Sequence, residues 1–218
     1  MKRFAIIVAG GSGQRMSASL PKQFLLLKGK PVIMHSIEKF YKCNADVVVV
    51  IPESNFNFWE ELKTKFNFSI PHFVTAGGNT RSESVFNGLK LIADDSIVAV
   101  HDAVRPLVSE TLIEKLFASA EKNGNAIPVV GLRDSIRKIS GAENSEVNRD
   151  DFRIVQTPQI FQTQILKQAF QKTTNRNFTD EASLVESCGI KINLEEGEQS
   201  NIKITFPEDL ILAEALLR

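Results

Sequence analysis

A glycine-rich segment near the amino terminus combines residue types that can bind phosphate. The segment Ala9–Met16 follows an apolar run, and backbone N–H groups exposed by glycine can cradle phosphate oxygens there. Arg15 and Lys22 supply cations able to reach the same phosphates, and residues 1–37 contain no Asp or Glu. A glycine cradle with several cations is what a polyanion requires, so the segment predicts a nucleoside triphosphate site. The residues expected to bind through this loop are Ala9, Gly10, Gly11, Ser12 and Gly13.

Other interpretations of the glycine segment fit less well. A dinucleotide-binding fingerprint needs a third glycine where Met16 stands, and an acid about 20 residues later. A P-loop needs a Gly-Lys-Ser/Thr ending that the segment does not have. A tight turn without any ligand is compatible with the glycines alone, but the neighbouring cations favour the phosphate site.

One acidic and one basic residue that could bind a ligand follow a later apolar run. Asp102 and Arg105 come after residues 97–101, at the edge where open α/β sheets bind ligands. Asp102 could contact Mg²⁺ or a ribose, or could cap the turn. Arg105 could bind phosphate or pair with Asp102.

The segment 77–84 and Lys203 are weaker candidates. The glycines of segment 77–84 could let a base approach the backbone while Asn79 or Ser84 supplies hydrogen bonds, although a capping box also explains part of it. Lys203 stands between two isoleucines in a predicted strand and, taken alone, is expected to face solvent.

Strands and helices must alternate to position these residues. Buried strands are predicted at Phe4–Val8, Asp46–Ile51, Phe73–Ala76, Ile97–His101 and Ala126–Val130. Between them, apolar residues recur with a helical period, and Ser109 and Gly124 can begin and end the fourth helix. This order predicts a mostly parallel, doubly wound α/β sheet.

The pattern of the sequence changes after residue 131. Residues 132–152 alternate like a ribbon strand and contain a turn at Gly141–Asn144, which predicts an inserted β-hairpin arm. An isolated hairpin is marginal in water, so we expect the arm to pack against a second copy in a homodimer. Later elements are predicted as helices at Thr163–Thr174 and Asp180–Cys188, strands at Ile190–Leu194 and Asn201–Thr205, and a closing helix that begins at Pro207.

Composition limits the other possibilities. A chain of 218 residues suits one domain, residues 1–218, and 26 basic residues balance 26 acidic ones. Nothing in this charge attracts nucleic acid or a membrane surface. Cys43 and Cys188 form no metal or disulfide pattern, which fits a reducing cytoplasm. The amino terminus also lacks a long apolar stretch, so we expect an unprocessed, soluble protein.

Seven blocks of the chain together resemble the 2-C-methyl-D-erythritol 4-phosphate cytidylyltransferases of the non-mevalonate isoprenoid pathway. They occur in the family's order and cover nearly the whole chain. The blocks are residues 9–16, Pro21–Phe24, Gly77 and Gly78 with Arg81, Ser84 and Val85, His101–Pro106, Gln156–Gln159, Thr179–Ser183, and Asn201–Thr205 with Pro207–Leu210.

The resemblance implies a Rossmann-like fold with a dimerising hairpin arm, and transfer of CMP from CTP to methylerythritol 4-phosphate with Mg²⁺. Carried over, Arg15 and Lys22 stabilise the transition state, while Arg149 and Lys203 position the attacking phosphate. Gly78, Asn79 and Ser84 match the loop that reads cytosine. Asp102, Arg105, Ser135 and Thr157 match other substrate-pocket positions, and Ser135 stands where the family often has Thr. Ribitol 5-phosphate as acceptor, or a non-catalytic nucleotide-binding protein, are the alternatives.

Overall fold

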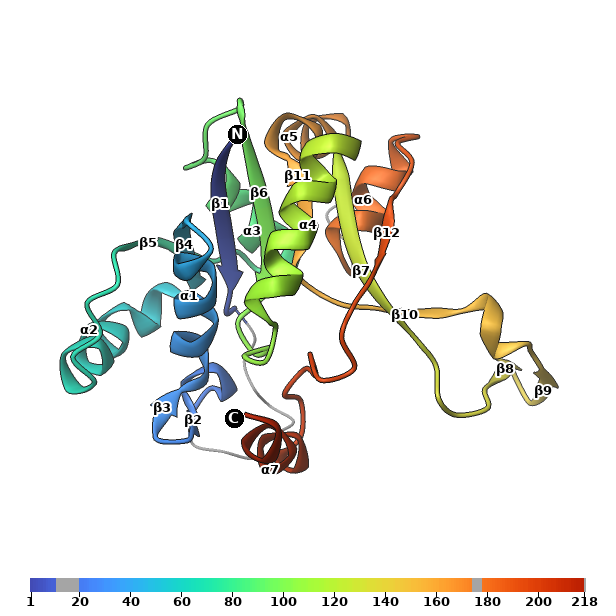
Figure 1. Ribbon diagram of the computed structural model, residues 1–218, viewed down its shortest axis with the longest axis horizontal. Helices are drawn as coiled ribbons and strands as arrows, with labels where there is room; N and C mark the ends of the chain where they lie inside the picture. Colours follow the sequence, from blue (N-terminus) through green and yellow to red (C-terminus); the bar gives the residue numbers. More distant parts are fainter. Residues whose placement is uncertain (11–19, 174–177, 218) are drawn as a thin grey trace.

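A central, mostly parallel sheet organises the chain. The computed structural model describes residues 1–10, 20–173 and 178–217. Within them the main sheet has eight strands in the order β10-β7-β11-β6-β1-β4-β5, with β12 beside β7 (Figure 1). These strands are β1 (Lys2–Val8), β4 (Ala45–Ile51), β5 (His72–Ala76), β6 (Ser96–Asp102), β7 (Asn125–Gly131), β10 (Arg153–Val155), β11 (Gln159–Gln162) and β12 (Leu194–Glu196). The predicted α/β class is confirmed.

Helices cover both faces of this sheet. The helices are α1 (Val32–Lys42), α2 (Phe56–Lys65), α3 (Arg81–Leu89), α4 (Glu110–Asn123), α5 (Thr163–Lys172), α6 (Glu181–Ser187) and α7 (Pro207–Leu216). Short 3₁₀ turns occur at η2 (Lys22–Phe24), η3 (Glu53–Asn55) and η4 (Arg149–Asp151). Two small hairpins, β2–β3 (Leu26–Leu27 with Lys30–Pro31) and β8–β9 (Arg137–Ser140 with Glu143–Glu146), lie outside the main sheet.

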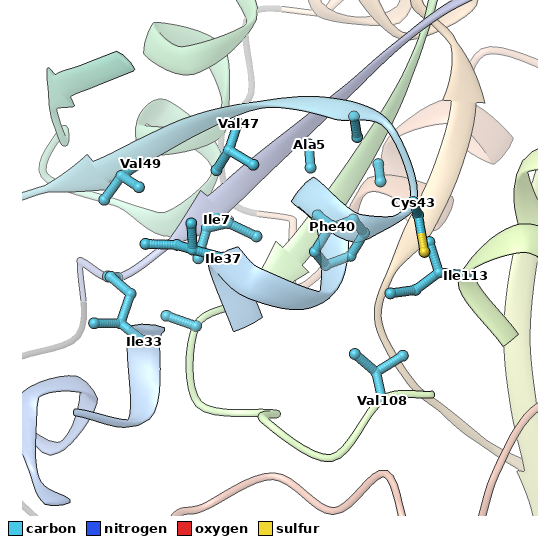
Figure 2. Close-up of a cluster of buried hydrophobic side chains, with 14 of the residues drawn as sticks. Ala5, Ile7, Ile33, Ile37, Phe40, Cys43, Val47, Val49, Val108 and Ile113 are labelled. Carbon is cyan, nitrogen blue, oxygen red and sulfur yellow. The ribbon is translucent and has the colours of Figure 1, made fainter. Parts of the chain in front are cut away.

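The two faces of β1 show why the sheet is covered on both sides. Ala5 and Ile7 belong to one core, where they pack with Ile37 and Phe40 of α1 (Figure 2). Ile6, on the opposite face, belongs to a second core with residues of α3, α5 and α6. Side chains alternate between faces along a strand, so a strand buried on both sides must be apolar throughout. This accounts for the continuous apolar run that predicted β1.

Several helix boundaries were predicted from their caps. Thr80 accepts a hydrogen bond from Glu83 N at 3.1 Å, and Ser109 accepts one from Leu112 N at 2.9 Å. Gly124 ends α4 with a φ of 87°, a conformation that glycine adopts without strain. The capping box at α3 differs from the prediction, because Glu83 accepts from Asn79 N at 2.7 Å.

Other boundaries were wrong. The predicted strand Asn201–Thr205 is not a strand in the structure, because its backbone makes separate bonds to different segments: Ile204 N donates to Val104 O, and Thr205 N donates to the Asp209 carboxylate in the cap of α7. The strand expected at Ile190–Leu194 instead begins at Leu194. The sequence reasoning also missed β10 and β11, which are only three and four residues long.

The predicted hairpin arm is present and extends away from the sheet (Figure 1). All eight residues of β8 and β9 are exposed, including Ile139. Nothing else in the described part of the chain covers these strands.

The order of the strands creates a switch point beside β1. The chain continues from β1 to β4 and β5 on one side, and then crosses to place β6 on the other side of β1. Open α/β sheets bind ligands outside the carboxyl ends of the strands at such a point. Val8 pairs with Asp102 there, so the ends of β1 and β6 lie side by side.

Candidate active site

Backbone hydrogen bonds fix the loops that leave this edge of the sheet. Ala9 N donates to Val50 O at 2.9 Å, Ala103 N to Val8 O at 3.0 Å and Gly77 N to Ile51 O at 2.9 Å. Gln23 is buried, and its Nε2 donates to Ala9 O at 2.8 Å, which connects the turn carrying Lys22 to the end of β1. Three loops from distant parts of the sequence therefore meet at one edge.

These loops enclose a cleft of about 200 Å³. Most of the predicted nucleotide-binding residues line it, from the start of the glycine segment, the 77–84 loop, the end of β6 and the segment before α7. The lining residues are Val8, Ala9, Gly10, Lys22, Gln23, Gly78, Asn79, Thr80, Arg81, Ser84, Asp102, Val104 and Lys203.

The 77–84 loop is built from internal hydrogen bonds. Ser84 Oγ accepts from Gly78 N at 3.0 Å and donates to Thr80 O at 2.9 Å. A Cβ added at Gly78 would lie 2.4 Å from Glu83 Cβ, closer than side-chain contacts allow. Glycine is therefore required at this position for the loop to keep its shape, and the same loop lines the cleft.

Asp102 is the centre of the charged residues in the site. Its Oδ1 contacts Arg81 Nε at 3.2 Å, and its Oδ2 contacts Lys203 Nζ at 2.9 Å. Arg105 Nε lies 3.7 Å from Oδ2, which is too long for a hydrogen bond but close enough for an ionic contact. Burial raises the pKa of Asp102, but Arg81, Lys203 and Arg105 together lower it well below its usual range. The carboxylate is therefore ionised at neutral pH and holds three cations.

Glu181 contributes a second carboxylate behind this cluster. Its Oε1 contacts Arg81 Nη1 at 2.6 Å, so Arg81 bridges two acids. Burial lowers the pKa of Arg81, but Glu181 and Asp102 raise it more, and the guanidinium stays charged. Burial raises the pKa of Glu181, and its contact with Arg81 opposes this rise. The cluster of described residues around Asp102 thus brings together three basic side chains and two carboxyl groups.

A neutral histidine supports the backbone at Asp102. Thr157 Oγ1 accepts from Asp102 N at 3.0 Å and lies 3.2 Å from His101 Nδ1, while His101 Nε2 lies 3.1 Å from Arg105 O. One tautomer satisfies all of these bonds: Nε2–H donates to the Arg105 carbonyl and Nδ1 accepts from Thr157. Burial lowers the pKa of His101 to about 4, so the ring is neutral at physiological pH.

A second pocket of about 150 Å³ shares the charged cluster with the cleft. Arg81, Asp102 and Lys203 line both of them. Arg105 and Thr157, which were predicted to contact the second substrate, line this second pocket with Thr179 and Asp180. The geometry therefore provides two adjoining binding spaces with cations between them, as a reaction between two anions requires.

Lys203 is exposed, as its own segment predicted, but it also belongs to the site. Its ammonium contacts Asp102, because the segment 201–205 is not a strand and passes over the end of β6 instead. The resemblance had placed Lys203 in the site.

Arg81 is among the residues that carry the resemblance, but no role was predicted for it. One signal could have identified it: a cation at the first position of a helix opposes the helix dipole, and such a position usually needs an anionic partner. Glu181 offers no such signal, because acids are favoured at the start of a helix.

The remaining predicted residues lie elsewhere. Arg149 and Ser135 are exposed residues of the arm and line neither pocket, and Arg149 Nη1 donates to Arg133 O at 2.6 Å. Gly11, Ser12, Gly13 and Arg15 lie outside the described residues.

The predicted metal ligand, Asp102, is a single carboxylate. Across residues 1–10, 20–173 and 178–217 there is no group of three His, Cys, Asp or Glu side chains that could hold a metal. No helix of that same part of the chain is long and apolar enough to span a membrane.

A mostly parallel sheet with cations and two adjoining pockets at its switch point defines an α/β protein of the nucleotide-binding class. The comparisons agree with this class. The family model for IspD, 2-C-methyl-D-erythritol 4-phosphate cytidylyltransferase, matches residues 4–218. The chain belongs to this family.

Individual relatives are similar to this chain over nearly its whole length. The protein named 2-C-methyl-D-erythritol 4-phosphate cytidylyltransferase in Azobacteroides pseudotrichonymphae is 48% identical, covering 99% of each chain. The protein of that name in Bacteroides thetaiotaomicron is 44% identical over 100% of each. Among solved structures, the enzyme of that name from Thermus thermophilus has a TM-score of 0.80 and 32% identity, covering 99% of this chain and 98% of its own.

Proposed function

We propose that this chain transfers CMP from CTP to 2-C-methyl-D-erythritol 4-phosphate, giving 4-diphosphocytidyl-2-C-methyl-D-erythritol and pyrophosphate in isoprenoid precursor biosynthesis. Membership of the family supports this reaction. The observation that carries the proposal is the cluster at Asp102, where Arg81 and Lys203 stand between two adjoining pockets. We propose that residues 1–218 act as one cytidylyltransferase domain.

Each substrate has its own pocket in this proposal. CTP occupies the cleft, with its base against Gly78, Asn79 and Ser84 and its phosphates toward the glycine segment and Lys22. The acceptor occupies the second pocket, where Arg105 and Thr157 contact it. Lys203 lines both pockets, which suits a cation that holds the acceptor phosphate near the nucleotide.

The reaction needs cations more than it needs a base. An oxygen of the acceptor phosphate attacks the α-phosphorus of CTP, and the bond from that phosphorus to the bridging oxygen breaks to release pyrophosphate. A phosphomonoester has a second pKa of about 6, so the nucleophile is already mostly dianionic at neutral pH. Charge builds on the α-phosphate and the leaving group, where Arg15 and Lys22 are proposed to stabilise it. None of the three histidines is required as a base.

The donor chemistry fits Mg²⁺ carried in with the triphosphate. Mg²⁺ commonly binds through one or two carboxylates together with substrate phosphates and water. An ionised carboxylate has about four lone-pair sites, and Asp102 uses two for its close contacts with Arg81 and Lys203. Asp102 therefore retains capacity for the ion. When bound, Mg²⁺ neutralises charge on the phosphate oxygens.

The arm suggests how Arg149 and Ser135 reach a site. Both lie on the exposed arm of this chain and line neither of its pockets. Ile139, Phe152 and Ile154 on and beside the arm are exposed apolar side chains that a second copy could cover. We therefore propose a homodimer in which the arm brings Arg149 to the acceptor phosphate of the partner subunit. A cytoplasmic location is also proposed, and two unpaired cysteines support it.

An acceptor screen tests the function. The protein is incubated with CTP, Mg²⁺ and either methylerythritol 4-phosphate or ribitol 5-phosphate, and pyrophosphate release is followed. The screen is repeated with UTP and ATP in place of CTP. Release that requires both CTP and methylerythritol 4-phosphate is expected. Release with ribitol 5-phosphate alone would assign a different acceptor, and no release with either would refute transferase activity.

A further inference from the structure

Glu181 is a buried acid with no part in the proposed reaction. It lies at the start of α6, and its side chain is 2% exposed. It lines neither of the two pockets, so it cannot touch a substrate bound there. Its Oε1 contacts Arg81, while Oε2 is buried with no hydrogen-bond partner among the residues that the structure describes. Burying a carboxylate with one unsatisfied oxygen costs free energy, so its presence calls for a reason other than stability.

A chain of contacts connects this buried acid to the site. Glu181 contacts Arg81 at 2.6 Å, Arg81 contacts Asp102 at 3.2 Å, and Asp102 contacts Lys203 at 2.9 Å. Exposure of the side chains rises from 2% at Glu181 to 43% at Lys203. Carboxyl groups and basic side chains therefore alternate from the interior to Lys203, the cation that lines both pockets.

Arg81 is shared between the carboxyl groups of Glu181 and Asp102. Glu181 binds Arg81 through Nη1, and Arg81 reaches Asp102 through Nε alone. A guanidinium released from Glu181 could turn and bind Asp102 with two N–H groups, the geometry that Arg and carboxylates favour. Oδ2 of Asp102 would then move away from the Lys203 ammonium.

We infer that Glu181 is a positioning residue: by holding Arg81 from behind, it leaves Oδ2 of Asp102 free to fix the Lys203 ammonium between the two pockets. This inference rests on the proposed function for its kinetic consequences. It also has a consequence in the free protein, since Lys203 should be held less firmly when Glu181 loses its charge.

The loop proposed to bind the base should be unaffected. Gly78 N is held by Ser84, and Asn79 N is held by Glu83, both within the same loop. Loss of the Glu181 charge should therefore act on the acceptor and on the chemical step, with little effect on the KM for CTP.

The test compares Glu181→Gln and Glu181→Asp with a matched control, Glu186→Gln, at an exposed position of the same helix. Glutamine keeps the size of the side chain and removes its charge, whereas aspartate keeps the charge and removes a methylene. We expect Glu181→Gln to lower kcat/KM for the acceptor by about tenfold or more, with KM for CTP within about twofold. Glu181→Asp should be more active than Glu181→Gln, although its melting temperature should be lower because of the cavity. The control should match the wild type.

Two results would overturn the inference. One is a Glu181→Gln protein with wild-type kinetics. The other is a Glu181→Asp protein whose activity is equal to or below that of Glu181→Gln, since activity would then follow packing instead of charge.

A second measurement does not depend on turnover. Each protein is treated with limiting acetic anhydride, and acetylation of Lys203 relative to the exposed Lys122 is measured by peptide mass spectrometry. We expect the ratio to rise at least about threefold in Glu181→Gln, because an amine released from Asp102 is more accessible to the reagent. An unchanged ratio would overturn the inference. If the wild type makes no product, the proposed function fails, and this ratio alone decides the role of Glu181.

Discussion

His101 should make the stability of the protein depend on pH in a defined interval. The ring is fully buried, packs 5.0 Å from Phe40, and is held as the neutral form by Thr157 and the Arg105 carbonyl. Its pKa is lowered from 6.5 to about 4 by burial. The unfolded chain therefore binds a proton at a pH where the folded chain does not. The stability that this provides is complete above about pH 6.5 and is lost as the pH falls toward 4.

The size of the effect follows from the two pKa values. Linkage gives a loss of about 2 kcal/mol between about pH 7 and about pH 5, and about 3 kcal/mol by about pH 4. Removing His101 removes this proton uptake. The variant His101→Asn should be less stable than the wild type near neutral pH, and the difference between the two should shrink by about 2 kcal/mol near pH 5.

Urea unfolding of both proteins at the two pH values measures this difference. His35 and His72 also have lowered pKa values through burial, but both proteins contain them, so their contributions cancel in the comparison. A stability difference that is the same at both pH values would refute the reasoning, because it would mean that His101 is not held neutral in the folded protein.

Three further substitutions test the proposed site. Lys22→Ala should lower kcat by about 10² to 10³ while the protein still folds, as judged by circular dichroism, and turnover like that of the wild type would remove Lys22 from the mechanism. Gly78→Ala should raise the KM for CTP by about tenfold, because the added Cβ would lie 2.4 Å from Glu83 Cβ and displace the loop; an unchanged KM would place the base elsewhere. Mixing inactive Lys22→Ala and Arg149→Ala proteins under subunit exchange should restore part of the activity, and verified heterodimers without activity would contradict an Arg149 that acts across the dimer.

The regular part of the fold could be predicted because its signals are local. The run that forms β1 is apolar on both faces, and Ser109 and Gly124 mark the two ends of α4. The strands β10 and β11 could not be predicted in this way. They are short, and their pairing with β6 and β7 is set by distant parts of the chain.

The site was predictable where residues follow strands. Asp102 lies directly at the end of β6, and the glycine segment begins at the end of β1, so both had to lie at the carboxyl edge of the sheet. Lys203 could not be placed from its own segment, because its position depends on backbone bonds to Val104 and to the cap of α7. Glu181 acts through Arg81, and such an indirect role leaves no pattern in the sequence.

The central claim is that the acceptor's phosphate attacks the α-phosphorus of CTP, and isotope labelling tests it most directly. Methylerythritol 4-phosphate labelled with ¹⁸O in its phosphate is incubated with the protein, CTP and Mg²⁺, and both products are weighed by mass spectrometry. We predict that all of the label is found in 4-diphosphocytidyl-2-C-methyl-D-erythritol and that the pyrophosphate carries none. Label in pyrophosphate, or no labelled cytidine product, would contradict the claim.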